Sequence, residues 1–257
     1  MHPVFFEFKS FVIHTYGIMA ALGFLFAIMV SGFLAKKENI KKNEISDLAV
    51  YIILSAIIGA RVFYFFVEPE YFLKNPIEIF KIWKGGLVFY GGFVFGLLGA
   101  FIFIKKRKLP FGKTADIIAP ALALGHGIGR IGCFFAGCCY GRPTELPIGI
   151  VFKNPEALAP LNLSLHPVQI YSVLSNFFLF AVLIFFYKRK KNDGDVFLLY
   201  LFLYGILRMI IEYFRGDNRG EFILGVFSLS QFIGFLAVIS AVLIYLFKIM
   251  KHKTLEK

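Results

Sequence analysis

Four arginines, Arg61, Arg130, Arg208 and Arg215, and one acid, Glu212, lie within otherwise apolar stretches of the chain. A charge inside an apolar span costs about 2.5 to 3.5 kcal/mol on insertion scales, so such residues usually face a partner or a polar cavity and mark function. A guanidinium group also presents a planar set of donors that fits a phosphate. These residues predict a site that binds an anionic lipid headgroup.

Arg130 lies in the glycine-rich segment GHGIGRIGCFFAGCCYG, residues 125–141. Spacings of four and seven residues place His126, Arg130 and Cys133 on one face of a helix. The glycines allow a helix or a ligand to approach the backbone closely, although tight helix packing alone would also explain them. His126 is a candidate proton acceptor or, equally, a packed and hydrogen-bonded histidine.

A second set of polar residues follows on a later apolar stretch. Tyr204, Arg208, Glu212 and Arg215 recur at i, i+4, i+8 and i+11, which predicts all four on one helix face. Glu212 can therefore pair with either arginine. The alternative is that Glu212 only neutralises an arginine near the membrane interface, and that Arg215 and Arg61 extend to that interface. The other two arginines lie deeper, so this alternative suits them less.

Two tyrosines add to the candidates. Tyr16 lies at the start of the first apolar stretch, and Tyr90 lies in the glycine-flanked sequence GGLVFYGG, residues 85–92. Tyr90 can project into a cavity and handle a proton, or it can equally serve as an aromatic anchor at the membrane interface.

The chain has three cysteines, Cys133, Cys138 and Cys139. Their spacing resembles that of metal or redox sites, but no second pair of ligands follows and the nearby histidine would be a lone fourth ligand. No other cysteines exist to build a disulfide framework. We therefore expect structural or incidental cysteines, with no metal and no cofactor.

The elements that position these residues must be membrane-spanning helices. Of 257 residues, 58% are hydrophobic and 17% charged, and the mean hydropathy is +0.74. A water-soluble globule cannot bury that much apolar surface. The net charge of +12 comes largely from short basic clusters between apolar stretches. That pattern orients a membrane protein and does not predict nucleic-acid binding.

Each crossing needs about 20 mostly apolar residues. We predict an all-α integral membrane protein with seven transmembrane helices in a single polytopic domain, residues 1–257. The N-terminus lacks the features of a cleavable signal peptide, so the first stretch is predicted to be a true span. The predicted spans are residues 11–35, 47–67, 86–104, 115–136, 166–187, 196–214 and 226–247.

Alternate connections, together with the C-terminal tail, hold 17 of the 28 Lys and Arg residues. Because basic residues accumulate on the cytoplasmic side, we predict that the N-terminus lies outside and the C-terminus in the cytoplasm. The polar residues of six spans then fall in the outer half of the membrane. Residues 68–85, which include the only tryptophan, Trp83, are predicted to form an interfacial helix or, equally, a solvated loop. The outer half is also predicted to contain His14, His166 and Gln169.

The segment GRIGCFFAGCCYG, residues 129–141, resembles the signature of bacterial prolipoprotein diacylglyceryl transferases, and similar matches run along nearly the whole chain. They are HTYGIM at 14–19, GARVFY at 59–64, GGLVFYGG at 85–92, HPVQIY at 166–171 and YGILRMIIEYFRGD at 204–217.

The resemblance implies a seven-span transferase of the bacterial inner membrane. Such an enzyme moves diacylglyceryl from phosphatidylglycerol to the lipobox cysteine thiol of a prolipoprotein and releases glycerol 1-phosphate, the first step of lipoprotein maturation. By motif position, Arg130 corresponds to the family's phosphatidylglycerol-binding arginine and Arg208 to a second essential arginine. Four further candidates fall on family positions in the same cavity: Tyr16, Tyr204, Glu212 and Arg215.

The chain also departs from the family pattern. Some members have a histidine, proposed as the general base, at the position of Tyr90, and a phenol fills that role less readily near neutral pH. Cys133 and Cys138 replace polar residues of other members. We expect the two deeper arginines to bind the phosphate and to stabilise the leaving group. The catalytic candidates are His126, Tyr90 and Tyr204, and His126 is preferred to Tyr90 as the proton acceptor. The residues expected to support the site are Tyr16, Arg61, Glu212 and Arg215.

Two other classes of protein fit the sequence less well. An anion or lipid transporter also places arginines inside the membrane, but such proteins commonly show internal repeats and broken helices near the midplane. Here the polar residues gather on one side, and the sequence shows no repeat. An intramembrane protease is disfavoured, because the sequence has no serine with a paired histidine and no paired intramembrane aspartates at a suitable depth.

Overall fold

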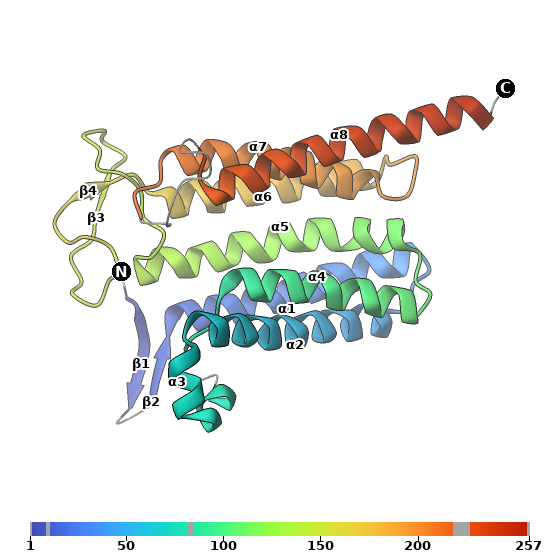
Figure 1. The fold of residues 1–257 in the computed structure, drawn as a ribbon. Helices are drawn as coiled ribbons and strands as arrows, with labels where there is room; N and C mark the ends of the chain where they lie inside the picture. Colours follow the sequence, from blue (N-terminus) through green and yellow to red (C-terminus); the bar gives the residue numbers. More distant parts are fainter. Residues whose placement is uncertain (1, 9–10, 82–84, 218–226, 256–257) are drawn as a thin grey trace. The chain divides into compact units, whose positions relative to one another are not determined.

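The structure, a computed structural model, describes residues 2–8, 11–81, 85–217 and 227–255 (Figure 1). In the part of the chain that it describes, seven helices are long and apolar enough to cross a membrane. They are α1 (Thr15–Lys37), α2 (Lys42–Val67), α4 (Phe89–Lys106), α5 (Phe111–Ala136), α6 (Val168–Tyr187), α7 (Asp195–Tyr213) and α8 (Leu229–Leu255). The predicted fold class, an α-helical membrane protein with seven membrane-spanning helices, is confirmed. Residue 226, the predicted beginning of the last span, lies outside the described residues.

The first span begins later than predicted. Residues 11–14 form a strand, β2 (Phe11–His14), which pairs antiparallel with β1 (Val4–Phe8). The hairpin satisfies the backbone groups of this segment. Helix α1 then begins at Thr15, whose backbone N–H donates to the carbonyl of Pro3 at 2.9 Å. A second short pair of strands, β3 (Ile150–Val151) and β4 (Ser164–Leu165), lies in the long connection between α5 and α6.

The segment predicted as an interfacial helix is helical in two short pieces. These are α3 (Pro69–Lys74) and the 3₁₀-helix η1 (Pro76–Phe80). Pro76 separates them, because a proline disfavours the helical conformation in the residue before it. Leu73, Ile77 and Phe80 are exposed, as expected of a segment at a membrane surface. Trp83 lies outside the described residues.

The chain forms two compact units: the first unit, residues 1–31 with 115–257, and the second unit, residues 32–114. In the second unit α2 packs closely on α4, since a Cβ on Gly59 or Gly91 would collide with the carbonyl group of the other. In the first unit a Cβ on Gly23 of α1 would lie 2.7 Å from the carbonyl oxygen of Gly125 of α5. Small residues thus let these helices approach each other closely.

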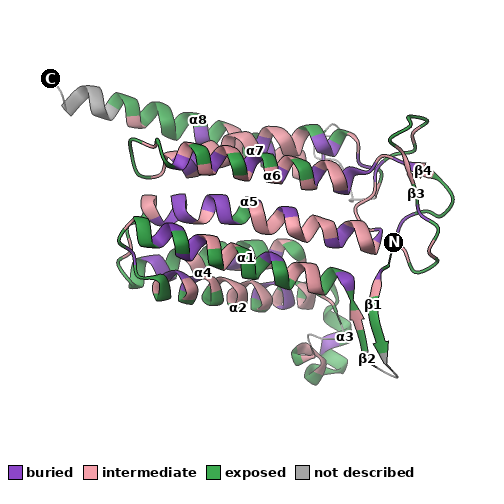
Figure 2. Cartoon of the chain, turned by 180° about the vertical axis from the view of Figure 1, so that it is seen from behind, coloured by how far each residue is buried: buried purple, intermediate pink, exposed green. Residues whose placement is uncertain are grey.

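Exposed residues recur along the helices (Figure 2), and many of them have large apolar side chains. Phe24 of α1, Leu97 of α4 and Phe178 of α6 are each more than half exposed. In lipid such side chains need no protein partner, whereas buried polar groups must find theirs within the protein. Contacts between polar side chains therefore specify most of how the helices pack within each unit.

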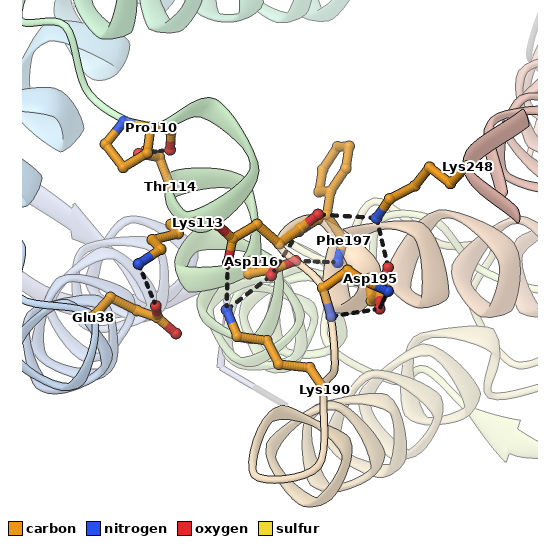
Figure 3. Close-up of polar contacts among 12 residues, drawn as sticks. Glu38, Pro110, Lys113, Thr114, Asp116, Lys190, Asp195, Phe197 and Lys248 are labelled. Atoms are coloured by element: carbon orange, nitrogen blue, oxygen red, sulfur yellow. Dashed lines mark hydrogen bonds and ion pairs between the residues drawn. The ribbon is translucent and has the colours of Figure 1, made fainter. Parts of the chain in front are cut away.

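Asp116 of α5 makes one such arrangement at the start of α7 (Figure 3). Its fully buried carboxylate accepts hydrogen bonds from the backbone N–H groups of Gly194 at 2.8 Å and Phe197 at 3.0 Å, and from Lys190 Nζ at 3.0 Å. The first N–H groups of a helix lack partners within the helix, and the helix dipole favours a negative charge there. One carboxylate therefore joins α5, the α6–α7 connection and α7, a contact that the sequence analysis did not predict.

Lys248 of α8 adds a second link at this end of the first unit. Its Nζ donates to Asp195 Oδ1 at 2.6 Å and to the carbonyl of Asp193 at 2.9 Å. The pair ties the start of α7 to α8 (Figure 3). Within the second unit, Lys113 and Glu38 form a looser ion pair at 3.7 Å.

We predict that Asp116→Ala destabilises the protein by about 3 to 5 kcal/mol, because it leaves the Lys190 charge and two helix N–H groups without their buried partner. The matched control is Asp193→Ala. The Asp193 side chain is 50% exposed and lies 3.8 Å from the same lysine, so its loss should cost less than about 1 kcal/mol. Thermal unfolding of the purified proteins in detergent measures both changes, and equal effects would contradict the assigned role of Asp116.

Candidate active site

A polar pocket lies within the first unit, among helices α5, α6 and α7. It brings together four of the candidates predicted from the sequence. Its volume is about 10 Å³, room for about one water molecule, so side chains fill most of the space. The lining residues are His126, Arg130, Ser172, Ser175, Asn176, Leu179, Tyr204, Leu207, Arg208 and Ile211.

Arg130 and His126 contact each other along α5. Arg130 Nε donates a hydrogen bond to His126 Nε2 at 3.0 Å, as the predicted spacing of one helical turn allows. A nitrogen that accepts a hydrogen bond carries no proton, so the imidazole is neutral with its proton on Nδ1. The Tyr204 ring lies beside it, with 5.7 Å between ring centroids. This half of the pocket therefore holds a guanidinium and a potential proton acceptor in direct contact.

Glu212 holds the second arginine of the pocket. Arg208 Nη2 lies 2.7 Å from Glu212 Oε2 and donates to Ser230 Oγ at 2.9 Å. The other Glu212 oxygen accepts a hydrogen bond from Ser228 Oγ at 3.0 Å. Arg215 Nε lies 3.8 Å from the same carboxylate. The prediction that Glu212 can pair with either arginine is confirmed, and the carboxylate lies between the two.

Arg215 is not on the face of α7, in contrast to the prediction. The helix ends two residues earlier, because the carbonyl of Phe214 accepts a hydrogen bond from Arg142 N and Arg215 forms a backbone bridge with Gly141. The Arg215 guanidinium donates to both carboxylate oxygens of Asp217 at 2.8 Å. Burial disfavours its charge, but the interactions with Asp217 and Cys139 together outweigh burial and raise the pKa of Arg215. Its side chain is only 3% exposed, so it does not extend outward.

Arg61 donates hydrogen bonds to backbone carbonyls of the second unit. Its guanidinium donates to the carbonyls of Ile79 at 2.8 Å, Gly85 at 2.7 Å and Gly86 at 3.0 Å. The side chain is buried, and it fixes the segment that precedes α4. Tyr90 lies half-buried in the first turn of that helix. Arg61 therefore supports the start of α4 and does not extend to an interface.

The remaining candidates of the first unit lie near the end of α5. Tyr16, the second residue of α1, lies against α5, since a Cβ on Gly132 would come within 3.1 Å of the Tyr16 Cα. Gln169, near the start of α6, donates from Nε2 to the carbonyl of Cys138 at 2.8 Å. His166 Nδ1 lies 3.2 Å from the Tyr171 hydroxyl. His14 ends β2, directly before α1.

The sequence analysis missed several polar residues of the pocket. Ser172 and Asn176 of α6 are buried, and Asn176 Nδ2 donates to the carbonyl of Ser172 at 2.7 Å. Their spacing of four residues within an apolar stretch is a signal that could have identified them. Ser228 and Ser230 could not be found in this way, because they reach the site only through the packing of α8 on α7.

The glycines of the signature segment divide into two kinds. A Cβ on Gly125 or Gly132 would press on α1, so the predicted close packing is confirmed at these positions. A Cβ on Gly129 would meet nothing within 4 Å. Helix packing therefore does not explain the glycine at position 129.

We predict that Glu212→Gln destabilises the protein by about 3 kcal/mol or more, because two buried guanidinium groups lose their shared counter-charge. The exposed Glu145 provides the control, since Glu145→Gln should change stability by less than about 0.5 kcal/mol. The double variant Arg208→Met with Glu212→Leu should cost less than the two single changes together. Strictly additive thermal shifts in detergent would argue against the pairing.

Comparison with known proteins identifies the family to which the chain belongs. The family model for prolipoprotein diacylglyceryl transferase matches residues 3–247. A phosphatidylglycerol–prolipoprotein diacylglyceryl transferase of Clostridium tetani is 39% identical over 245 residues, which cover 95% of this chain and 97% of the relative. One of Finegoldia magna is 37% identical, with 95% and 94% covered. The polar pocket, the seven helices and these matches agree: the chain belongs to the prolipoprotein diacylglyceryl transferase family.

Proposed function

We propose that this transferase moves the diacylglyceryl group of phosphatidylglycerol to the lipobox cysteine of a prolipoprotein, with release of glycerol 1-phosphate. The names of the relatives supply the two substrates. The observation that carries the proposal for the site is that Arg130 and Arg208, from two different helices, line one buried polar pocket. Two guanidinium groups at one pocket match the charge and the geometry of a phosphate.

Binding of the headgroup requires the pocket to open, because its present volume admits about one water molecule. Arg130 now donates to a neutral imidazole, and Arg208 donates to a neutral hydroxyl as well as to Glu212. A phosphate is a stronger acceptor than either neutral group. Both arginines can therefore turn donors toward the phosphate while Glu212 keeps Arg208 in place.

The chemical step joins the substrate sulfur to a glycerol carbon. The thiolate attacks the carbon, the carbon–oxygen bond to the phosphate breaks, and its electron pair leaves with glycerol phosphate. The two arginines stabilise the charge that develops on the leaving phosphate. His126 can take the thiol proton at Nε2 once Arg130 has turned to the phosphate, and the Tyr204 ring keeps the imidazole in position.

The proposed location is the bacterial inner membrane, with the N-terminus outside and the C-terminus in the cytoplasm. The seven apolar helices make the chain a multi-pass membrane protein, and the basic clusters at alternate connections support this orientation. A lipid substrate and a membrane-bound preprotein both suit such a location. A C-terminal reporter that is active only in the cytoplasm tests this orientation. We expect an active fusion, and an inactive fusion would indicate the opposite orientation.

We predict that Arg130→Ala lowers the rate of transfer by about 100-fold or more, the usual effect of removing one preorganised donor from a charged transition state. The assay follows glycerol phosphate release from phosphatidylglycerol, dependent on a lipobox peptide with a free thiol. Arg189→Ala removes an exposed arginine outside the pocket and should remain active. Normal transfer by purified Arg130→Ala would exclude the phosphate-binding role, and release without the thiol peptide would indicate a different reaction.

The order of the proton acceptors gives a separate prediction. His126→Ala should reduce transfer by about 100-fold, within the range for general bases, and Tyr90→Phe should have a smaller effect. Both proteins should still bind phosphatidylglycerol, because neither change removes a guanidinium group. Full activity of His126→Ala together with an inactive Tyr90→Phe would assign the proton to Tyr90 instead.

A further inference from the structure

The three cysteines of the chain come together where α5 ends. The Sγ atoms of Cys133, Cys138 and Cys139 all lie within 4.8 Å of one another. None of the three forms a disulfide, and Cys133 is buried. The sequence showed only an isolated cluster without a second pair of ligands; the structure shows that its members converge on one point.

The backbone turn after α5 produces this convergence. Gly137 and Cys139 both adopt positive φ angles, of 72° and 58°, and the chain folds back over the last turn of the helix. Cys138 Sγ then lies 3.7 Å from the carbonyl of Cys133. The turn is held from outside, since Leu158 N donates to the carbonyl of Ala136 at 3.1 Å. A non-glycine residue at positive φ is uncommon and often marks a functional constraint.

The spacing of the sulfurs fits a metal ion. Zinc binds thiolate sulfur at about 2.3 Å, so tetrahedral ligands lie about 3.8 Å apart. Sulfur atoms that are already within 4.8 Å of one another need to move by only about 1 Å to reach that distance. Soft thiolate ligands favour zinc and copper(I) over magnesium or calcium.

The surrounding charges also suit a set of thiolates. The guanidinium groups of Arg215 and Arg130 lie close enough to Cys139 to interact with its sulfur. Three thiolates and one divalent ion carry a net charge of −1, which the two arginines offset.

We propose that Cys133, Cys138 and Cys139 form a binding site for one thiophilic metal ion, with zinc as the ion to test. Three protein ligands leave a fourth coordination position for a ligand from outside the chain. The ion would hold the turn after α5 against the helix end that carries Arg130. This proposal concerns metal binding and does not depend on the proposed reaction.

Zinc content of the full-length protein, purified in detergent without a polyhistidine tag, tests the site. We expect about one zinc ion per chain after zinc loading and desalting. Substitution of any one cysteine by serine should raise the Kd for zinc by about 100-fold, at least the effect of losing an outer-shell partner. His126→Ala is the matched control, since His126 is seven residues before Cys133, about 10 Å along the helix, and the variant should retain zinc.

Thiol alkylation of the unsubstituted protein gives a test that needs no variant. The chain has three cysteines, so every reactive thiol belongs to the cluster. Zinc should slow the reaction of all three with iodoacetamide by about 10-fold or more, read by mass spectrometry. Equal alkylation with and without zinc, or zinc content that survives every Cys→Ser change, would overturn the proposal and leave packed thiols.

Discussion

The fold depends on the rule that a charge surrounded by apolar helices must find its partner within the protein. Glu212 shows the rule most clearly, because its buried carboxylate lies 2.7 Å from Arg208 and 3.8 Å from Arg215. Ser228 satisfies its remaining oxygen. Glu212 and its partners join α7, the start of α8 and the segment after α7. At the start of α7, Asp116 serves the same purpose with Lys190 and two backbone N–H groups.

The partners of an arginine distinguish a structural role from a binding role. Arg61 donates to several backbone carbonyls, and Arg215 to both oxygens of Asp217. Neither can release its partners without leaving buried polar groups unpaired, which is costly. Arg130 instead donates a hydrogen bond to a neutral imidazole, and Arg208 donates one of its hydrogen bonds to a neutral hydroxyl. These two arginines can exchange neutral partners for an anion, and they line the same pocket.

The sequence predicted most of the fold and the contacts within single helices of the site. Hydropathy located all seven helices, because the length of a membrane span leaves little freedom. Helical spacing predicted the Arg130–His126 and Arg208–Glu212 contacts, since residues four apart always lie on one face. It failed for Arg215, where a backbone bridge to Gly141 ends the helix. Contacts between distant segments, such as that of Asp116 with Phe197, leave no periodic pattern in the sequence.

The Arg130–His126 hydrogen bond gives the proposed reaction an order. While Arg130 donates to Nε2, that nitrogen cannot accept a proton, so the imidazole is blocked as a base. An anionic phosphate in the pocket competes for the guanidinium, and its arrival frees the nitrogen. The base therefore becomes available only when the lipid headgroup is bound. Binding of the phosphate and activation of the thiol are then coupled through one side chain.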